Sequence, residues 1–231
     1  MSQITPKLST LLGVAALSLT GMGQHTRASI WLLCMALSAC GFQSAPPLTP
    51  LPYSDDFSDP SSGWETLSDL NADVAYEAGT LRIVIKRENL IQWSAAGRRF
   101  GDAVFEVDAR PNGGPMDNGF GVVFRMKDRN NFYHFAISSD GYWRAGYVQD
   151  GTWSNWDDWQ PHPAIRPGSE VNRIKVVMQG AKLSFFVNDQ FIASREDSLY
   201  DSGDIGVFAL TLIDAPGTDI AFDNVQVNEV K

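Results

Sequence analysis

Short runs in which apolar and polar residues alternate recur along the chain from residue 53 onward. In Leu81–Lys86 every second residue is a large aliphatic side chain, and Phe105–Arg110 repeats the pattern. A period of two predicts β-strands with one buried face. The other runs of this kind are Gly119–Met126, Phe132–Ser138, Tyr142–Val148, Arg173–Met178, Lys182–Val187, Ile205–Leu212 and Asp219–Val227.

Turn-forming dipeptides separate these runs. They are Asp140-Gly141, Asp150-Gly151, Gln179-Gly180 and Asn188-Asp189. Each offers a residue that tolerates positive φ, as tight hairpins require. Many short strands joined in this way predict an all-β, antiparallel β-sandwich in a single domain, residues 53–231.

Two local departures from this pattern are informative. Between Ile220 and Val227 the apolar positions change phase, which predicts a β-bulge at Asp223-Asn224. The segment Asp150–Gly168 (DGTWSNWDDWQPHPAIRPG) hardly alternates and is rich in aromatic residues. Long ordered loops of this kind often carry binding sites.

The first 52 residues have a different character. Residues 1–39 are rich in apolar residues and end in Leu37-Ser38-Ala39 before Cys40, which resembles a bacterial lipoprotein signal peptide that precedes its lipidated cysteine. A transmembrane anchor is the alternative, but an apolar run of about 12 residues is shorter than the roughly 20 that a membrane crossing needs. Residues 40–52 form a Pro-rich tether, and Met22 is an alternative start to Met1. This interpretation places the domain outside the cytoplasm, lipid-anchored in the cell membrane or outer membrane.

Composition narrows the function. Eighteen Lys and Arg against 27 Asp and Glu give a net charge of -9, which argues against a nucleic-acid partner and against electrostatic membrane docking, so that the lipid is the only expected membrane contact. The 20 Gly and 12 Pro residues suit a loop-rich β protein. Because both cysteines, Cys34 and Cys40, precede the domain, it has no disulfide framework or thiolate metal site.

Several motifs then carry a family resemblance. Asp55–Trp64 (DDFSDPSSGW), Gly121–Arg125 (GVVFR), Asn131–Phe135 (NFYHF) and Phe222–Val225 (FDNV) resemble motifs of concanavalin A-like or laminin G-like jelly-roll domains. The resemblance covers nearly all of residues 53–229 and implies two packed antiparallel sheets with a concave face. Relatives include sugar-binding modules, the 3-keto-disaccharide hydrolase-like group and family 16 glycosidases, so the fold alone does not fix the chemistry.

Catalytic signals are weak. Family 16 glycosidases carry a strand motif E-x-D-x-E, and the nearest match here is Glu106-Val-Asp108-Ala-Arg110. Retaining hydrolysis needs two carboxylates, and Arg110 occupies the place of the second glutamate. Glu106 and Asp108 are therefore weak candidates, and the favoured interpretation is a surface ladder balanced by Arg110 and by bases on the neighbouring strands. The domain's two histidines, His134 in a strand and His162 in the long loop, show no metal-ligand or triad spacing.

The aromatic residues suggest a carbohydrate ligand. An exposed indole can stack on the apolar face of a sugar while neighbouring polar side chains bind its hydroxyls. Packing of the loop is an equally weighted alternative for the cluster, and burial is favoured for any single tryptophan. The candidate ligand-binding residues are Trp143, Arg144, Trp153, Asn155, Trp156, Asp158 and Trp159.

A structural calcium ion is a weaker prediction. Ca²⁺ prefers oxygen ligands and suits Asp-rich loops outside the cell. Asp55 and Asp56 would meet Asp223 and Asn224 if the first and last strands pair. The alternative is that these side chains cap turns.

The sequence as a whole predicts a lipid-anchored, non-catalytic module that binds a glycan. A glycoside hydrolase-like enzyme that uses Glu106 or Asp108 is the first alternative, and a structural or protein-interaction module is the second.

Overall fold

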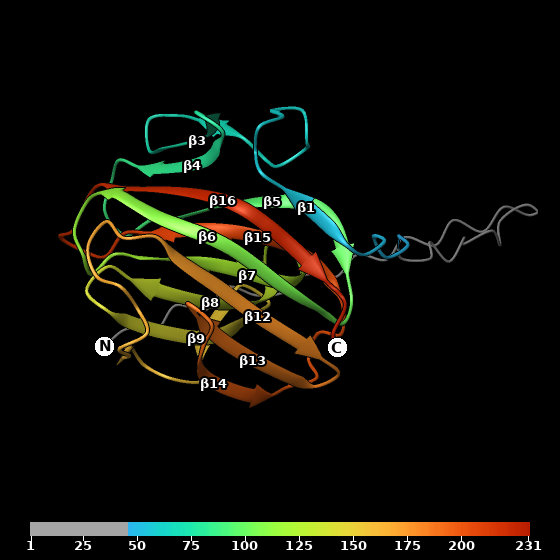
Figure 1. The fold of residues 1–231 in the computed structure, drawn as a ribbon. Helices are drawn as coiled ribbons and strands as arrows, with labels where there is room; N and C mark the ends of the chain where they lie inside the picture. The colour runs from blue at the N-terminus through green and yellow to red at the C-terminus, as the bar shows by residue number, and fades with distance from the viewer. Residues whose placement is uncertain (1–45) are drawn as a thin grey trace, which may run out of the picture. The chain divides into compact units, whose positions relative to one another are not determined.

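The computed structural model describes residues 46–231, which form one compact unit (Figure 1). The signal peptide and Cys40 lie outside the described residues. Within residues 46–231 there are sixteen strands, and no helix is long and apolar enough to cross a membrane. The strands are β1 (Tyr53–Asp55), β2 (Leu67–Ser68), β3 (Ala72–Glu77), β4 (Thr80–Ile85), β5 (Ile91–Phe100), β6 (Ala103–Gly113), β7 (Gly119–Asp128), β8 (Asn131–Ser138), β9 (Tyr142–Gln149), β10 (Thr152–Asn155), β11 (Gln160–Pro161), β12 (Asn172–Gln179), β13 (Lys182–Val187), β14 (Gln190–Glu196), β15 (Gly203–Leu210) and β16 (Thr218–Asn228).

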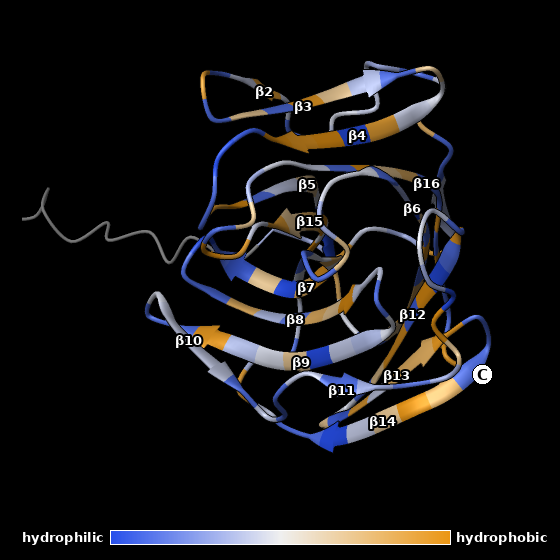
Figure 2. Ribbon diagram, turned by 90° about the vertical axis from the view of Figure 1, so that its left-hand side faces the viewer, coloured by the Kyte–Doolittle hydropathy of each residue, from blue (hydrophilic) through white to orange (hydrophobic). Residues whose placement is uncertain are grey.

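The strands form two antiparallel sheets. The nine-stranded sheet has the order β14-β13-β12-β6-β16-β4-β3-β2, with β1 paired to β16. The seven-stranded sheet has the order β10-β9-β8-β7-β15-β5, with β11 paired to β9. Figure 2 separates the two layers, with β6, β12 and β16 on one side of the sandwich and β7, β8 and β9 on the other. The predicted antiparallel sandwich is confirmed.

The main core lies between the sheets. Alternate residues of each strand point into it, as the sequence period predicts, so that Ile83 and Val107 from the nine-stranded sheet pack in one cluster with Val122 and Phe135 from the seven-stranded sheet. Burial of this apolar area stabilises the fold by about 25 cal/mol for each Å² removed from water. A second, smaller apolar cluster that includes Phe132 lies apart from the main core.

The predicted turns and bulge are present. Asp150, Asn188 and Gly141 all have positive φ, which explains the Asp, Asn and Gly residues at these hairpins. The register of β16 against β6 shifts between Asp223 and Gln226, and Asn224 has a φ of 53°, so the bulge predicted from the change of phase is confirmed. β1 pairs with β16, and the first and last strands of the domain therefore meet as expected.

Candidate functional site

The side of the seven-stranded sheet that faces away from the main core carries an unusual set of side chains. Cross-strand partners share a face, so the register defines which residues lie there. One row across the sheet is Trp93, Phe208, Gly121, Ala136 and Arg144. The next row is Ala95, Gly206, Val123, His134, Gly146 and Asn155. We call this surface the tryptophan face.

Glycines leave part of the tryptophan face without side chains. A Cβ atom on Gly121 would lie 2.1 Å from the carbonyl oxygen of Phe135, and one on Gly146 would lie 2.2 Å from that of Ser154. No larger residue fits at either position unless the neighbouring strand moves. Both glycines are buried, and a Cβ atom on Gly146 would also lie 2.9 Å from Nε2 of His134, so neighbouring side chains cover the backbone here.

Three tryptophans pack against the small buried cluster on this face. The rings of Trp93 and Trp153 both pack against Phe132, with centroids 5.8 Å and 5.5 Å from the Phe132 ring. Trp159 comes from the long loop, and its indole lies against Gly119. A Cβ atom added to Gly119 would be only 3.0 Å from the indole. The guanidinium carbon of Arg144 lies 4.8 Å from the centroid of the Trp159 ring, within the range of a cation–π interaction.

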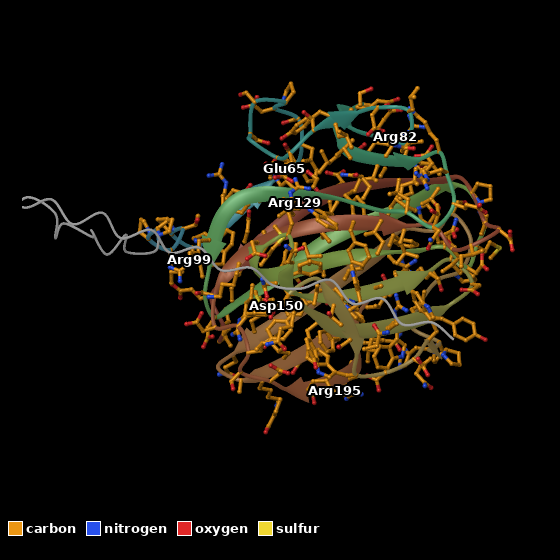
Figure 3. All side chains as sticks on the ribbon, turned by 180° about the vertical axis from the view of Figure 1, so that it is seen from behind. Glu65, Arg82, Arg99, Arg129, Asp150 and Arg195 are labelled. Carbon is orange, nitrogen blue, oxygen red and sulfur yellow. The ribbon has the colours of Figure 1, made fainter. Side chains whose placement is uncertain are left out.

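Charged groups frame one end of the face. The guanidinium of Arg129 lies 5.5 Å from the centre of the Trp93 ring and donates to Glu65 over 2.8 Å. Figure 3 shows Glu65 and Arg129 close together, whereas Arg195 lies near the opposite end of the molecule. This end of the tryptophan face therefore carries a charge pair that is already balanced.

Polar atoms inside the tryptophan face lack hydrogen-bond partners. Among the described residues, Nε1 of Trp93, Nε of Arg144 and both ring nitrogens of His134 are buried with no partner. Buried polar groups are nearly always paired, so four such atoms on one face need an explanation.

The electrostatics of the two basic residues reflect this burial. Burial and, to a smaller extent, the nearby charge of Arg144 lower the pKa of His134 to about 3, so the imidazole is neutral at ordinary pH. Burial also lowers the pKa of Arg144, and the carboxylate of Asp158 opposes this effect.

The structure divides the predicted ligand-binding residues between two sides of the sheet. Arg144, Trp153, Asn155 and Trp159 lie on the tryptophan face, and Asp158 is exposed near Arg144. These five residues remain candidates for ligand contact.

Trp143 and Trp156 instead pack into the main core. Trp143 is 6% exposed and lies 6.3 Å from Phe135, ring centre to ring centre. Trp156 packs against Tyr133 at 5.6 Å and Phe185 at 6.3 Å. The prediction that Trp143 and Trp156 bind the ligand is therefore wrong. Alternation along β9 turns Trp143 towards the core, and the path of the chain after β10 turns Trp156 the same way.

The weak catalytic candidates lie on the other sheet. Glu106 and Asp108 point outward from β6, where Glu106 accepts from Lys175 over 2.8 Å and Asp108 accepts from Arg173 over 3.1 Å. Burial opposes the charge on Arg173, but the carboxylates of Glu106 and Asp108 raise its pKa. We call this surface the ion-pair face. The predicted surface ladder with neighbouring bases is present, and it does not include Arg110 among its ion pairs.

The predicted calcium ligands have other partners. Asp55 accepts hydrogen bonds from Phe57 N at 2.9 Å and from Trp64 Nε1 at 3.0 Å, and Asp56 accepts from Ser58. Asp223 accepts from the backbone of Asn224, whose side-chain amide donates to Asp108. Among residues 46–231 no three His, Cys, Asp or Glu side chains are grouped to hold a metal ion. Asp55, Asp56 and Asn224 do line one pocket, but Arg98 lines it as well and would repel a cation.

Sequence reasoning did not identify Trp93 or His134 as site residues. Trp93 lies on β5, which the alternation does not reveal, and the sequence places His134 in a strand without metal-ligand or triad spacing. The pairing order β5-β15-β7-β8-β9 brings both to the same face as Arg144. A signal for His134 exists in hindsight, because it alternates with the apolar residues of β8 that face the main core.

The two stacked sheets and their bulged last strand define a concanavalin A-like β-sandwich. No protein-family model matches the chain, and no curated protein sequence matches it. Solved structures of similar fold include the carbohydrate-binding module CBM66 from Bacillus subtilis, at 16% identity and a TM-score of 0.57 over 73% of this chain and 96% of that one. A native glycosidic hydrolase matches at 12% identity and a TM-score of 0.61 over 80% and 99% of the two chains. A β-glucanase from Bacillus licheniformis matches at 10% identity and 0.58 over 78% and 98%. At these identities the likeness establishes the fold.

Proposed function

We propose that residues 53–231 form a non-catalytic module that binds a saccharide on the tryptophan face. The chain would be a bacterial lipoprotein, held outside the cytoplasm by a lipid on Cys40 and lifted from the cell membrane or outer membrane by the tether of residues 40–52. Solved neighbours named for carbohydrate binding and for glycoside hydrolysis support a saccharide as the ligand.

The observation that carries this proposal is the pairing of tryptophans with unpartnered polar atoms on one face. Trp93, Trp153 and Trp159 offer apolar ring surface, and sugars present C–H faces that suit it. Arg144 is half-buried and its Nε has no partner among the described residues, so sugar hydroxyls would satisfy it. His134 is fully buried and lies out of reach of a ligand.

Binding rather than hydrolysis is favoured by the distribution of carboxylates. Hydrolysis of a glycosidic bond generally uses two carboxyl groups on either side of the bond. The two rows that cross the tryptophan face contain no Asp or Glu. Of the carboxylates at its edges, Glu65 is paired with Arg129 and Asp158 lies near Arg144. Glu106 and Asp108 lie on the other sheet, in ion pairs.

A broad glycan array probed with the full-length protein tests the ligand class. We expect selective binding that Trp153→Ala removes and Phe191→Ala preserves. Phe191 is the matched control, because it is 55% exposed on β14 of the other sheet. Loss of binding in both variants would indicate nonspecific adhesion, and binding unaffected by Trp153→Ala would place the site elsewhere. Release of reducing ends from a bound glycan would contradict the non-catalytic assignment.

The anchor is tested separately in cells that incorporate labelled palmitate. We expect Cys40→Ser to abolish labelling and Cys34→Ser, the matched control, to retain it. Labelling that persists in Cys40→Ser would show that Cys40 is not the lipidated residue.

A further inference from the structure

Arg144 differs from Arg125, another arginine with buried guanidinium atoms. Arg125 is deeply buried, and its terminal nitrogens donate to Asp102 at 2.9 Å, to Gly180 O at 2.9 Å and to Tyr200 O at 3.0 Å. Nε lacks a partner in both arginines, but Arg144 is half-buried and its guanidinium forms no ion pair or hydrogen bond at all within the described residues. A guanidinium that has lost part of its hydration without gaining an anion is unfavourable unless a ligand supplies one.

The surroundings of Arg144 orient it for such a ligand. Trp159 covers one face of the guanidinium at 4.8 Å, which leaves the N–H groups at the edge of the plane directed elsewhere. A guanidinium edge matches the two oxygens of a carboxylate or sulfate. The carboxylate of Asp158 acts on Arg144 through its charge, but Asp158 is exposed and forms no hydrogen bond with Arg144 among the described contacts.

His134 adds a neutral partner beside this cation. It lies one row away from Arg144 on β8, and its ring centre is 4.9 Å from that of Trp153. The imidazole is neutral and fully buried, so it places no second positive charge beside Arg144 and contacts no ligand directly.

We propose that the saccharide bound by the tryptophan face is acidic, and that Arg144 binds its carboxylate or sulfate group. This inference rests on the proposed function and names the ligand class of the same site. The protein as a whole is acidic, with a net charge of -9, so recognition of an anion would depend on this local arrangement and not on overall charge.

The test is a binding panel in which each acidic oligosaccharide stands beside its neutral counterpart. Oligogalacturonate and oligomannuronate are paired with their carboxyl-reduced forms, and heparin and chondroitin sulfate oligosaccharides with their desulfated forms. Titration calorimetry on the full-length protein should show at least about tenfold tighter binding to an acidic member, as expected for charge-assisted hydrogen bonds. The two arms distinguish a carboxylate from a sulfate.

Variants then assign the preference to Arg144. Arg144→Gln should abolish it while leaving weaker binding of the neutral counterpart, and Arg144→Lys should restore part of it. Arg110→Gln is the matched control, since Arg110 is exposed on β6 and its loss changes the net charge equally. Thermal unfolding of each variant confirms that it folds.

Three results would overturn the inference. Equal or tighter binding of the neutral members would refute the acidic ligand and leave saccharide binding intact. An equal loss in Arg144→Gln and Arg110→Gln would attribute the preference to general charge. Failure of every member to bind would remove the proposed function together with the inference.

Discussion

The outward faces of the two sheets differ in whether their charged side chains are paired. On the ion-pair face, acids and bases from neighbouring strands contact each other directly, as Lys175 and Glu106 do at 2.8 Å. Arg82 extends this pattern at 2.7 Å from Glu77. On the tryptophan face, Arg144 and His134 lie among indoles without such partners.

The polar groups of the ion-pair face already have partners within the protein, whereas several polar groups of the tryptophan face do not. Paired side chains on the ion-pair face satisfy one another and gain little from a further ligand. Unpartnered nitrogens beside aromatic rings would gain hydrogen bonds from a ligand that also covers the rings. Sequence motifs drew attention to Glu106 and Asp108, but the geometry favours the opposite sheet.

The largest expected effect concerns an indole that packs in the main core. Trp156→Ala removes contacts with Tyr133 and Phe185 and should lower the free energy of unfolding by about 3 kcal/mol. Saccharide binding by the folded variant should be retained. Urea unfolding followed by calorimetry below the transition checks both. Loss of binding with unchanged stability would show that Trp156 contacts the ligand and does not act mainly in the core.

Trp153→Ala, on the tryptophan face, should weaken saccharide binding more than it lowers the stability of the fold. We expect a loss of about 2 kcal/mol in binding free energy, or about 30-fold in Kd, because aromatic anchors dominate such contacts. Titration calorimetry against Phe191→Ala measures it. A larger change in unfolding free energy than in binding would show that Trp153 acts mainly in packing.

The buried imidazole of His134 should make the stability of the fold depend on pH. The folded-state pKa of His134 is about 3, held down first by burial and then by Arg144, while its unfolded value is near 6.5. The unfolded chain therefore binds the extra proton as the pH falls below about 6.5, so stability is lost towards low pH. Between pH 7 and 5.5 the native protein should lose about 1.3 kcal/mol more than His134→Gln does. Urea unfolding at both values measures the difference, and equal losses would show that the imidazole is accessible to protons in the fold.

The smallest effect is expected on the ion-pair face. Glu106→Gln leaves Arg173 paired with Asp108 and Lys175 paired with Asp189. Its unfolding free energy should fall by less than about 1 kcal/mol, and glycan binding should not change. Chemical denaturation and calorimetry test this, and any turnover of a bound glycan that this variant lost would support the enzymatic alternative.

The sequence predicts those strands in which apolar and polar residues alternate strictly. Lys182–Val187 was predicted with the bounds that β13 has. β5 was missed because Gly97 has positive φ and the register with β15 shifts nearby, which breaks the period. β14 was also missed, since its register against β13 shifts between Phe185 and Phe186.

The candidate site could be predicted only in part. The sequence placed Arg144, Trp153 and Trp159 among the ligand candidates, but it could not show which way each indole points. The segment predicted as a long loop begins with β10, which holds Trp153 on the tryptophan face, and Trp156 follows just after β10 and packs on the other side of the sheet. Trp93 joins Trp153 only through pairing of strands far apart in the sequence, which no local pattern reveals.

The most direct test of the central claim is an NMR titration of the indole N–H signals. The protein is labelled with ¹⁵N-tryptophan and titrated with the tightest-binding oligosaccharide from the glycan array. We expect the signals of Trp93, Trp153 and Trp159 to shift and those of Trp64, Trp143 and Trp156 to stay in place. Shifts confined to Trp143 and Trp156, with the three signals of the tryptophan face unmoved, would contradict the account.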